Sequence, residues 1–498
     1  MDSPTAYSLA QFKLASAWQL RDKPDRAMEC LLKAIEADPG YVPAYLECSV
    51  LLDSNGQREK AIQMLNQGLR RNPGEPGLIS ALRQLMDRAS VSESAGLLRT
   101  APTENGKRIL FYTDCSGIHG VQQNTMLLME ELLDRGYDVH CAHPGGDNFL
   151  IQKQKRIGVR HFRLGEDDIY NLKRTPRAFT AYEEPERVIG EIDPRMIFFA
   201  NGCPYSNLTA QETALRRSIP YISNIHCLNE AWFEQYRMYT ERLVNVLRHA
   251  RKVIAVSKNN LERMRYHLRW GSKNEMVIYN GRPPAYFKEK NETVRQQVRA
   301  RYNIPEEAIV SFTAARMEYV KGYHHQIEAM RDLKRSPFQK KLFFLWAGTG
   351  SLEARLRVMA EEAGLSDNIL FLGEVDAVPD FLDASDMVIL TSRFEGMPLS
   401  VIEGMAKGLP VIATSVGGTP EALGDIGYLL PDPVNDPKAT TSGLISALRT
   451  LATDYESRQK IGEACRKRAL RLFQMTDMTN AYLEQIVHIL GRKENYAP

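Results

Sequence analysis

The stretch from Met387 to Thr414 constrains the fold more than any other part of the 498-residue chain. Met387–Leu390 and Val411–Thr414 are short apolar runs, which predicts two buried strands of a parallel sheet. Pro398 suits the first turn of a helix between them, and Lys407–Pro410 marks the end of that helix. A strand, a helix and a second strand in this order favour an α/β fold.

Two glutamates lie on either side of the start of this helix. Glu395 lies in the strand-to-helix loop and Glu403 lies inside the helix, so the two carboxylates can reach opposite ends of one ligand. The amides of Gly396 to Ser400 lie at the positive end of the helix and suit an anionic group. The two carboxylates would each bind a polyol and the amides would bind a phosphate between them. A nucleotide sugar contains these three groups in this order. Glutamates at this spacing also occur by chance on solvated faces, and the loop context is what favours a ligand site.

Composition excludes several classes of protein. Hydrophobic residues make up 43% and charged residues 25% of the chain, as in soluble globular proteins, and a net charge of +3 does not support a nucleic-acid binder. The sequence has neither a run of 18 apolar residues nor a signal-peptide pattern at its start. Its seven cysteines lack C-x-x-C spacing. We therefore expect free thiols in a reducing compartment and a cytoplasmic protein.

The first 88 residues contain a repeat. Arg26–Ile35 matches Lys60–Leu69, with small and large apolar residues in the same positions, and this pattern resembles tetratricopeptide repeats. Two repeats and a capping helix at Pro76–Arg88 fall short of the roughly three repeats that independent stability usually needs. We expect this module to pack on its neighbour, on a protein partner or on a second copy of the chain, although a helical extension without a partner stays open. Residues 89–106 are rich in Ser, Thr, Ala and Glu, which predicts a linker.

Strands alternate with helices from residue 107 to residue 300, which predicts a first doubly wound domain. Ligands of such domains bind at the carboxyl ends of the strands, so the first loop, with Gly117 and Gly120 before a helix start, belongs to this edge. His226 directly follows the predicted strand Pro220–Ile225 and lies at the same edge. It could orient a sugar hydroxyl or stabilise developing charge, but a lone histidine is often only a packed residue.

A second α/β domain opens with the strand Ala308–Phe312. Arg316 and Lys321 lie in the strand-to-helix loop that follows, so both cations can converge on one anion. For a diphosphate leaving group they would neutralise the charge that builds as the glycosidic bond breaks. No set of His, Cys and acidic residues has metal-ligand spacing, and we expect no metal site.

Together these residues resemble glycosyltransferase family 4, the retaining group with the two-domain GT-B fold, over about residues 107–490. The most specific element is Phe394–Ala406, followed by Gly408–Ala413 and Gly417-Gly418. The resemblance implies an α/β protein in which two Rossmann-like, doubly wound domains face a cleft, preceded by a small all-α repeat domain. The expected division is helical repeats at 1–88, a linker at 89–106, an acceptor domain at 107–300, a nucleotide-sugar domain at 301–475, and a C-terminal helix at 476–498 that crosses back to the first Rossmann-like domain.

The resemblance also implies roles for individual residues. Glu395 would hold hydroxyls of the donor sugar, Glu403 the ribose, and the amides of residues 396–400 sugar and phosphate. Gly120 falls where the first loop meets phosphate or acceptor. The catalytic residues so implied are His226, Arg316, Lys321 and Glu395, and the donor-binding residues are Gly120, Arg316, Lys321, Glu395, Gly396, Met397, Pro398, Leu399, Ser400 and Glu403. The family uses neither a metal nor a cofactor beside the nucleotide diphosphate sugar, and its implied chemistry is front-face displacement.

The sequence departs from the family pattern at two places. His119-Gly120 replaces the usual Gly-Gly pair, and Arg282 stands where an acidic residue is common. Both changes leave the identity of the acceptor open.

We expect a retaining, metal-independent glycosyltransferase of surface polysaccharide or glycolipid synthesis, with a sugar, lipid or protein acceptor. Protein glycosylation through the repeats and a non-catalytic nucleotide-sugar scaffold are the alternatives. Basic segments at 248–252 and 263–273 would allow at most peripheral contact with the inner face of a membrane.

Overall fold

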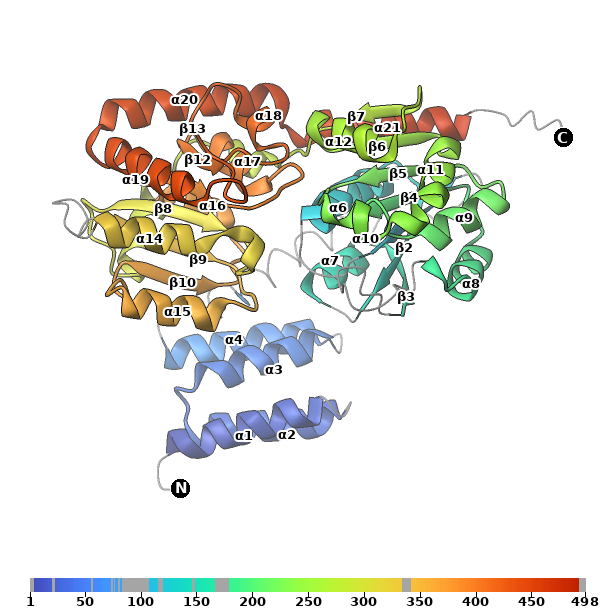
Figure 1. Ribbon diagram of the computed structural model, residues 1–498. Helices are drawn as coiled ribbons and strands as arrows, with labels where there is room; N and C mark the ends of the chain where they lie inside the picture. Colours follow the sequence, from blue (N-terminus) through green and yellow to red (C-terminus); the bar gives the residue numbers. More distant parts are fainter. Residues whose placement is uncertain are drawn as a thin grey trace. The chain divides into compact units, whose positions relative to one another are not determined.

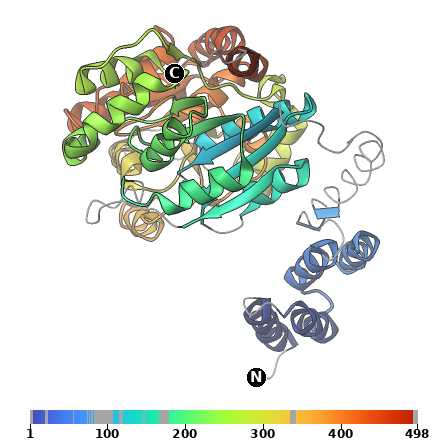
Figure 2. The ribbon, with the colours of Figure 1, turned by 90° about the vertical axis from the view of Figure 1, so that its right-hand side faces the viewer.

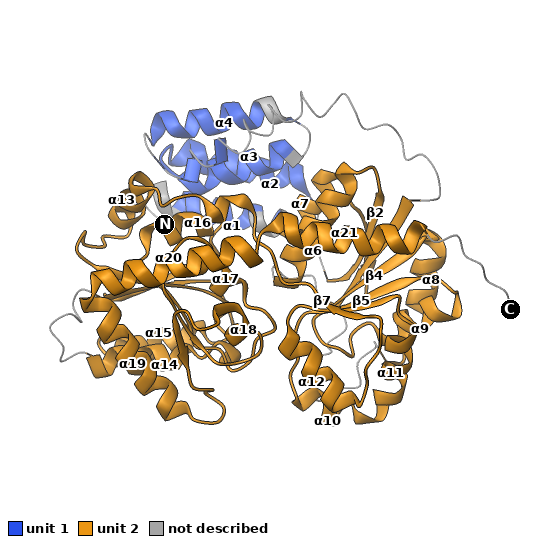
Figure 3. Cartoon of the chain, turned by 90° about the horizontal axis from the view of Figure 1, so that it is seen from above, with its two compact units in different colours: residues 1–103 blue, residues 104–498 orange. Residues whose placement is uncertain are grey.

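The computed structural model describes residues 4–19, 23–54, 57–72, 75, 77–78, 81–82, 107–114, 120–145, 148–165, 179–333 and 342–491. The chain divides into two compact units, residues 1–103 and 104–498, which Figure 3 colours separately. The predicted linker and most of the predicted capping helix lie outside the described residues. His119 lies outside them as well.

The first unit is all-helical. Its helices are α1 (Pro4–Gln19), α2 (Pro24–Ala37), α3 (Val42–Ser54) and α4 (Arg58–Arg71), and in Figure 1 α1 lies beside α2 and α3 beside α4. The small residues of the repeat are buried where helices approach each other. A Cβ added to Gly68 would lie 3.0 Å from both Tyr45 and Leu78, so this position, which matches Ala34 of the first repeat, accepts only a small residue.

The second unit begins with a seven-stranded parallel sheet in the order β3-β2-β1-β4-β5-β6-β7. Its strands are β1 (Arg108–Thr113), β2 (Asp138–Pro144), β3 (Arg160–Leu164), β4 (Met196–Asn201), β5 (Tyr221–Ile225), β6 (Lys252–Ala255) and β7 (Glu275–Val277). The helices are α6 (Gly120–Asp134), α7 (Phe149–Ile157), α8 (Glu183–Ile192), α9 (Leu208–Arg216), α10 (Ala231–Gln235), η3 (Arg237–Tyr239), α11 (Thr240–His249) and α12 (Lys258–Leu268). Helices cover both faces, so Ile109 and Phe111 of β1 join one core and Leu110 and Tyr112 join the other (Figure 2).

A second parallel sheet follows, with six strands in the order β10-β9-β8-β11-β12-β13. Its strands are β8 (Ile309–Ala314), β9 (Leu342–Ala347), β10 (Ile369–Gly373), β11 (Met387–Leu390), β12 (Val411–Thr414) and β13 (Tyr428–Leu430). The helices are η4 (Pro284–Phe287), α13 (Glu292–Arg301), η5 (Tyr319–Lys321), α14 (Tyr323–Leu333), α15 (Glu353–Glu362), α16 (Val378–Ala384), α17 (Leu399–Ala406), α18 (Thr419–Leu423), α19 (Pro437–Thr453) and α20 (Tyr455–Leu472). The predicted fold class, two Rossmann-like sheets after a helical repeat region, is confirmed.

The chain crosses between the two sheets twice, side by side. The amide of Arg282 donates to the carbonyl of Phe473 at 2.8 Å, and the amide of Met475 donates to the carbonyl of Arg282 at 3.0 Å. The last helix, α21 (Met475–Gly491), then packs on the first sheet, where Tyr482 lies 5.6 Å from the ring of Phe198 (Figure 1). The second crossing therefore returns the chain to the first sheet. Among the described residues, no helix combines the length and hydrophobicity that crossing a bilayer requires.

Candidate active site

Lys321 and Glu395 meet where two strand-to-helix connections of the second sheet approach each other. Lys321 ends η5, which follows β8, and Glu395 lies between β11 and α17. The ammonium nitrogen of Lys321 lies 2.5 Å from Oε1 of Glu395, and both side chains are largely buried. A hydrogen bond between groups of opposite charge at this distance holds the two side chains together. The pair thus supplies a cation and an anion to the same spot.

Arg316 lies in the same connection as Lys321, and its side chain is exposed. Its charge, like those of Lys321 and Glu395, acts on Cys227, which directly follows His226 in the first Rossmann-like domain. Burial raises the pKa of the Cys227 thiol to about 12, the charge of Glu395 adds to the rise, and the charges of Lys321 and Arg316 oppose it. The charges of Glu395, Lys321 and Arg316 thus all act on the Cys227 thiol.

The start of α17 is pressed against the first Rossmann-like domain. Pro398 is the N-cap residue, one position before the helix, and its carbonyl accepts from Ile402 at 3.3 Å. The side-chain amide of Asn280 donates to the carbonyl of Met397 at 2.8 Å. A Cβ added to Gly396 would lie 1.7 Å from the carbonyl oxygen of His226, so only glycine allows this approach. The amides of Leu399 and Ser400 belong to the first turn of α17, where amides lack intrahelical acceptors.

Replacing Gly396 with alanine should force the two Rossmann-like domains apart, because its Cβ would occupy the position of the His226 carbonyl. We expect at least a tenfold loss of affinity for a nucleoside diphosphate, measured by calorimetry. Gly271→Ala is the matched control, since a Cβ at Gly271 meets no atom within 4 Å. Equal affinities for the two variants would contradict this reading of the contact.

Glu403 lies inside α17 and faces the chain crossing. Its Oε1 lies 2.8 Å from Nη2 of Arg282, and both side chains are almost fully buried. The same guanidinium nitrogen donates to the hydroxyl of Tyr286 at 2.9 Å and lies 3.3 Å from Oε1 of Gln123 in α6. Burial raises the pKa of Glu403, while the charge of Arg282 and a hydrogen bond from Tyr286 oppose the rise. The structure thus brings Glu403 to Arg282, and no contact among the described residues joins it to Lys321 or Glu395.

His226 is buried at the carboxyl end of β5. Its amide donates to the carbonyl of Asn201 at 2.9 Å, and its Nε2 lies 3.0 Å from the side-chain nitrogen of Asn224. That nitrogen also donates to the hydroxyl of Tyr482 in α21 at 3.0 Å. Burial lowers the pKa of His226 to about 4, so the ring is neutral near pH 7. Because an amide NH₂ can only donate, Nε2 accepts and the ring proton is on Nδ1.

Gly120 is the first residue of α6 and faces the loop of residues 396–400, which precedes and begins α17. A Cβ added at Gly120 would lie 3.3 Å from Cδ1 of Leu399, at the start of α17. The structure therefore brings Gly120, the loop of residues 396–400 and the backbone of His226 together. Gly117, the other glycine of the predicted first loop, lies outside the described residues.

Glu421 is a contact between the two Rossmann-like domains that sequence reasoning did not select. Its carboxylate accepts from the amide of Lys258 at 3.0 and 2.8 Å, from that of Asn259 at 3.3 Å and from the hydroxyl of Tyr279 at 2.6 Å. These amides open α12, so a carboxylate from the second domain satisfies the helix start of the first. The glycine pair Gly417-Gly418 and the proline before Glu421 mark the start of a helix in the sequence. The partner of Glu421, the amide of Lys258, lies more than 150 residues away in the chain and could not be inferred from it.

Comparison with known proteins matches most of the chain. The model described as glycosyl transferases group 1 matches residues 294–468, the model of glycosyltransferase family 4 matches residues 118–286, and a tetratricopeptide repeat model matches residues 20–85. The N-acetyl-alpha-D-glucosaminyl L-malate synthase of Bacillus anthracis is 27% identical over 213 residues, 42% of this chain and 53% of that protein. A putative colanic acid biosynthesis glycosyltransferase, WcaL of Salmonella typhimurium, is 33% identical over 32% of this chain and 42% of its own. The chain thus spans about half the length of the curated relatives it matches.

Solved structures share the fold. Anabaena Alr3699/HepE in complex with UDP and glucose superposes with a TM-score of 0.64 at 17% identity, covering 76% of this chain and 99% of that one. WaaG, a glycosyltransferase involved in lipopolysaccharide biosynthesis, gives a TM-score of 0.60 at 16% identity over 75% of this chain and 98% of its own. At such identities the likeness concerns the fold alone.

Proposed function

Because this chain belongs to glycosyltransferase family 4, we propose that it moves a sugar from a nucleotide diphosphate sugar to an acceptor hydroxyl, with retention of configuration and without a metal. The observation that carries the proposal is the contact of Lys321 with Glu395 beside the start of α17. A cation for the diphosphate and a carboxylate for sugar hydroxyls stand next to helix amides that suit a phosphate. Arg316, in the same strand-to-helix connection as Lys321, adds a second positive charge.

The proposed reaction breaks one bond and forms one at C1 of the donor sugar. The C1–O bond to the diphosphate breaks, and the nucleotide leaves with the electron pair. The acceptor oxygen bonds to C1 from the same face, and its proton passes to an oxygen of the departing diphosphate. Lys321 and Arg316 stabilise the charge on that leaving group. Glu395 accepts from hydroxyls of the sugar, and the Nδ1–H of the neutral His226 donates to one of them.

Hydrolysis of a donor is the direct test. UDP-glucose is the first donor to try, since a structure of similar fold is a complex of Anabaena Alr3699/HepE with UDP-glucose. We expect the purified protein to release UDP slowly from UDP-glucose, or GDP or ADP from the corresponding sugar nucleotides, and to melt at higher temperature with the same diphosphate. A protein that releases none of these diphosphates and gains no stability from them would be a scaffold or have another function.

The names of similar proteins support a proposal for the acceptor. One relative is named for colanic acid biosynthesis, and one structure of similar fold is involved in lipopolysaccharide biosynthesis. These names support a surface polysaccharide or glycolipid precursor as acceptor. The helical unit of α1 to α4 favours the second candidate, transfer to a polypeptide that the repeats recruit.

Deleting residues 1–103 should separate these two acceptors. The deletion removes one whole compact unit, so we expect donor hydrolysis within twofold of the full chain, measured as diphosphate release. If the repeats recruit a polypeptide, transfer to that polypeptide falls while hydrolysis persists. Loss of hydrolysis together with a lowered melting temperature would instead make the repeats part of the fold of the enzyme.

Chelation should leave the reaction intact, because Lys321 and Arg316 take the place of a cation on the diphosphate. We expect UDP release in 5 mM EDTA, roughly the concentration used to strip divalent ions, to equal that in added Mg²⁺ within a factor of about two. A loss in EDTA that Mg²⁺ or Mn²⁺ restores would contradict metal independence.

A further inference from the structure

The two Rossmann-like domains are also joined where α18 of the second domain meets the start of α12 of the first (Figure 1). Glu421 of α18 accepts hydrogen bonds from the amides of Lys258 and Asn259 and from the hydroxyl of Tyr279. The first amides of a helix lack acceptors within that helix, so the carboxylate supplies acceptors that α12 itself cannot. The positive end of α12 also favours the negative charge of Glu421. The contact therefore stabilises the meeting of the two domains.

Each side of this contact is fixed within its own domain. In the second domain, the guanidinium of Arg468 in α20 donates to the carbonyl of Ala422 at 2.7 Å and to that of Glu421 at 2.9 Å. In the first domain, the side chain of Ser257 caps α12 by accepting from the amide of Asn260 at 3.1 Å. The distance between α18 and the start of α12 is therefore set by how the two domains meet.

α18 follows a glycine pair that packs directly on the backbone of the candidate active site. The amide of Gly418 donates to the carbonyl of Gly396 at 2.8 Å, and a Cβ added at Gly417 would lie 1.7 Å from the carbonyl oxygen of Glu395. Gly396 in turn meets the carbonyl of His226 in the first domain. A movement of α18 relative to α12 therefore moves Glu395 relative to His226.

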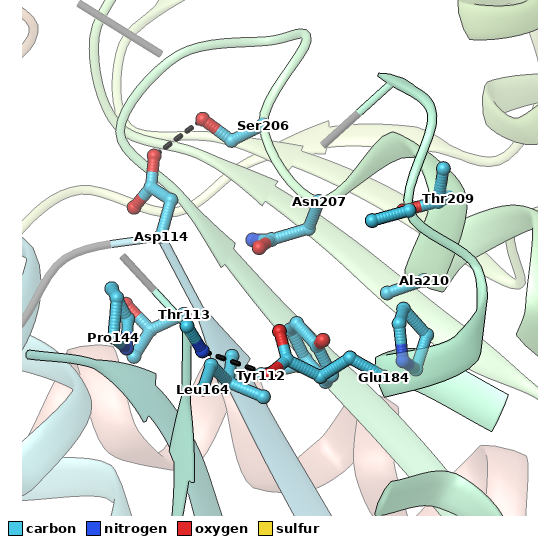
Figure 4. A pocket seen from close by; sticks show the side chains of 13 residues that line it. Tyr112, Thr113, Asp114, Pro144, Leu164, Glu184, Ser206, Asn207, Thr209 and Ala210 are labelled. Atoms are coloured by element: carbon cyan, nitrogen blue, oxygen red, sulfur yellow. Dashed lines mark hydrogen bonds between the residues drawn. The ribbon is translucent and has the colours of Figure 1, made fainter. Parts of the chain in front are cut away.

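His226 is fixed within the first domain and moves with it. Its amide donates to the carbonyl of Asn201 at 2.9 Å, and the side-chain oxygen of Asn201 accepts from Asn207 at 2.8 Å. Asn207 belongs to the connection of β4 to α9, where Asp114, directly after β1, accepts from the hydroxyl of Ser206 (Figure 4). The position of the histidine relative to the second domain thus depends on the contact between the domains.

The same contact covers the residues assigned to the donor. The side chains of Lys321 and Glu395 are 19% and 11% exposed, and His226 is 6% exposed. A nucleotide sugar has to reach side chains that are covered in this arrangement, so the domains have to part before it can enter and before the diphosphate can leave.

Asn260 favours such an opening. Its side-chain nitrogen lies 3.4 Å from the carbonyl oxygen of His226, which places it where the domains meet. Its side-chain oxygen is buried and has no hydrogen-bond partner among the described residues. A buried oxygen of this kind raises the free energy of the closed arrangement, and water can satisfy it when the domains part. Glu421 thus stabilises an arrangement that Asn260 weakens.

We propose that Glu421 is a positioning residue of the transfer reaction. It holds the two domains in the arrangement that places Glu395 beside His226, and it releases α12 each time a donor enters or a diphosphate leaves. The inference rests on the proposed function, because it concerns the reaction assigned to Glu395 and His226. Glu421 acts through the position of the domains and not through contact with a substrate.

Glu421→Ala should lower kcat for diphosphate release at least tenfold, while KM for the donor changes less than threefold. The two constants respond differently because Lys321, Arg316 and the amides at the start of α17, which are assigned to the diphosphate, lie in the same domain as Glu421. The substitution adds no atom, so it leaves the donor loop in place, unlike Gly396→Ala. Glu421→Gln keeps one acceptor oxygen without the charge, and its kcat should fall between those of the wild type and Glu421→Ala.

Asp436→Ala is the matched control. Asp436 also caps a helix with its carboxylate, accepting from the amide of Ala439 at 2.9 Å, but both residues belong to the second domain. Its kcat should stay within twofold of the wild type. A kcat of Glu421→Ala equal to that of the control would overturn the inference. A rise of KM as large as the fall of kcat would overturn it as well, because Glu421 would then support the donor site itself.

Hydrogen exchange of the full chain measures the contact directly. In a peptide that covers residues 256–264, the amides of Lys258 and Asn259 should exchange at least tenfold faster in Glu421→Ala than in Asp436→Ala, because they lose their acceptor. Equal exchange in the two variants would overturn the inference. Glu421→Gln carries both measurements if Glu421→Ala does not fold. Absence of diphosphate release from the wild type would overturn the proposed function instead, and the exchange would still report whether Glu421 joins the domains.

Discussion

Replacing Lys321 with alanine is expected to weaken the binding of the donor diphosphate by about 1–3 kcal/mol, the usual worth of a hydrogen bond to a charged group. Turnover should fall further, by roughly 10²–10³-fold, because the charge that Lys321 stabilises grows as the bond to the leaving group breaks. Calorimetry with UDP and an assay of UDP release measure the two effects. Lys438→Ala, at an exposed position of the same domain, serves as the control.

Glu395→Ala completes this test. It should lower turnover far more than it lowers the melting temperature, because Glu395 is proposed to hold sugar hydroxyls. The double variant should lose less than the sum of the single variants, since each change alone leaves the other charge of the pair without its partner. Equal relative losses of activity and of thermal stability in Glu395→Ala would remove Glu395 from the site.

Replacing Arg282 with methionine is expected to destabilise the protein by about 3–5 kcal/mol, because it leaves the carboxylate of Glu403 buried without a cation. The loss should depend on pH. Burial already raises the pKa of Glu403, and removing Arg282 raises it further. When the pKa of a carboxyl group is higher in the folded protein than in the unfolded chain, its contribution to stability is fully present at pH values below the pKa in the unfolded chain. This contribution is lost as pH rises through the pKa in the folded protein. The variant should therefore be closest to the wild type near pH 5 and furthest from it near pH 8.

Urea denaturation at several pH values measures this effect. Adding Glu403→Gln to Arg282→Met removes both charges and should recover part of the lost stability. A loss that is the same at pH 5 and pH 8, and that Glu403→Gln does not change, would mean that Arg282 acts through packing on Tyr286 rather than through its charge.

The fold could be predicted because its signals are local. Apolar runs such as Met387–Leu390 are short, and the proline and glycine residues that end the helices lie within a few positions of them. The meeting of Lys321 and Glu395 also follows from local information, because each residue follows a strand of the same parallel sheet and must lie at its carboxyl edge. Their assigned roles, like those of the other site residues, stay predictions.

The remaining contacts could not be predicted, because they depend on how the two Rossmann-like domains meet. Arg282 stood out only as a departure from the family pattern, and nothing in its neighbourhood indicates Glu403, more than 120 residues further along the chain. Glu421 has the same difficulty with the start of α12. Such pairs form where the glycine backbone of one domain approaches the backbone of the other. At Gly396 the close neighbour is His226, which is equally remote in sequence.

The return of α21 to the first sheet has a consequence for dissecting this protein into pieces. A fragment that ends near residue 300 would lack Met478, Tyr482 and Ile486, which cover one face of its sheet. Its exposed apolar face would promote aggregation, and the Asn224 amide that orients the His226 ring would lose the Tyr482 hydroxyl. Separate expression of the two halves should therefore fail, whereas joint expression of a chain cut in an exposed loop of the second half should restore a working assembly.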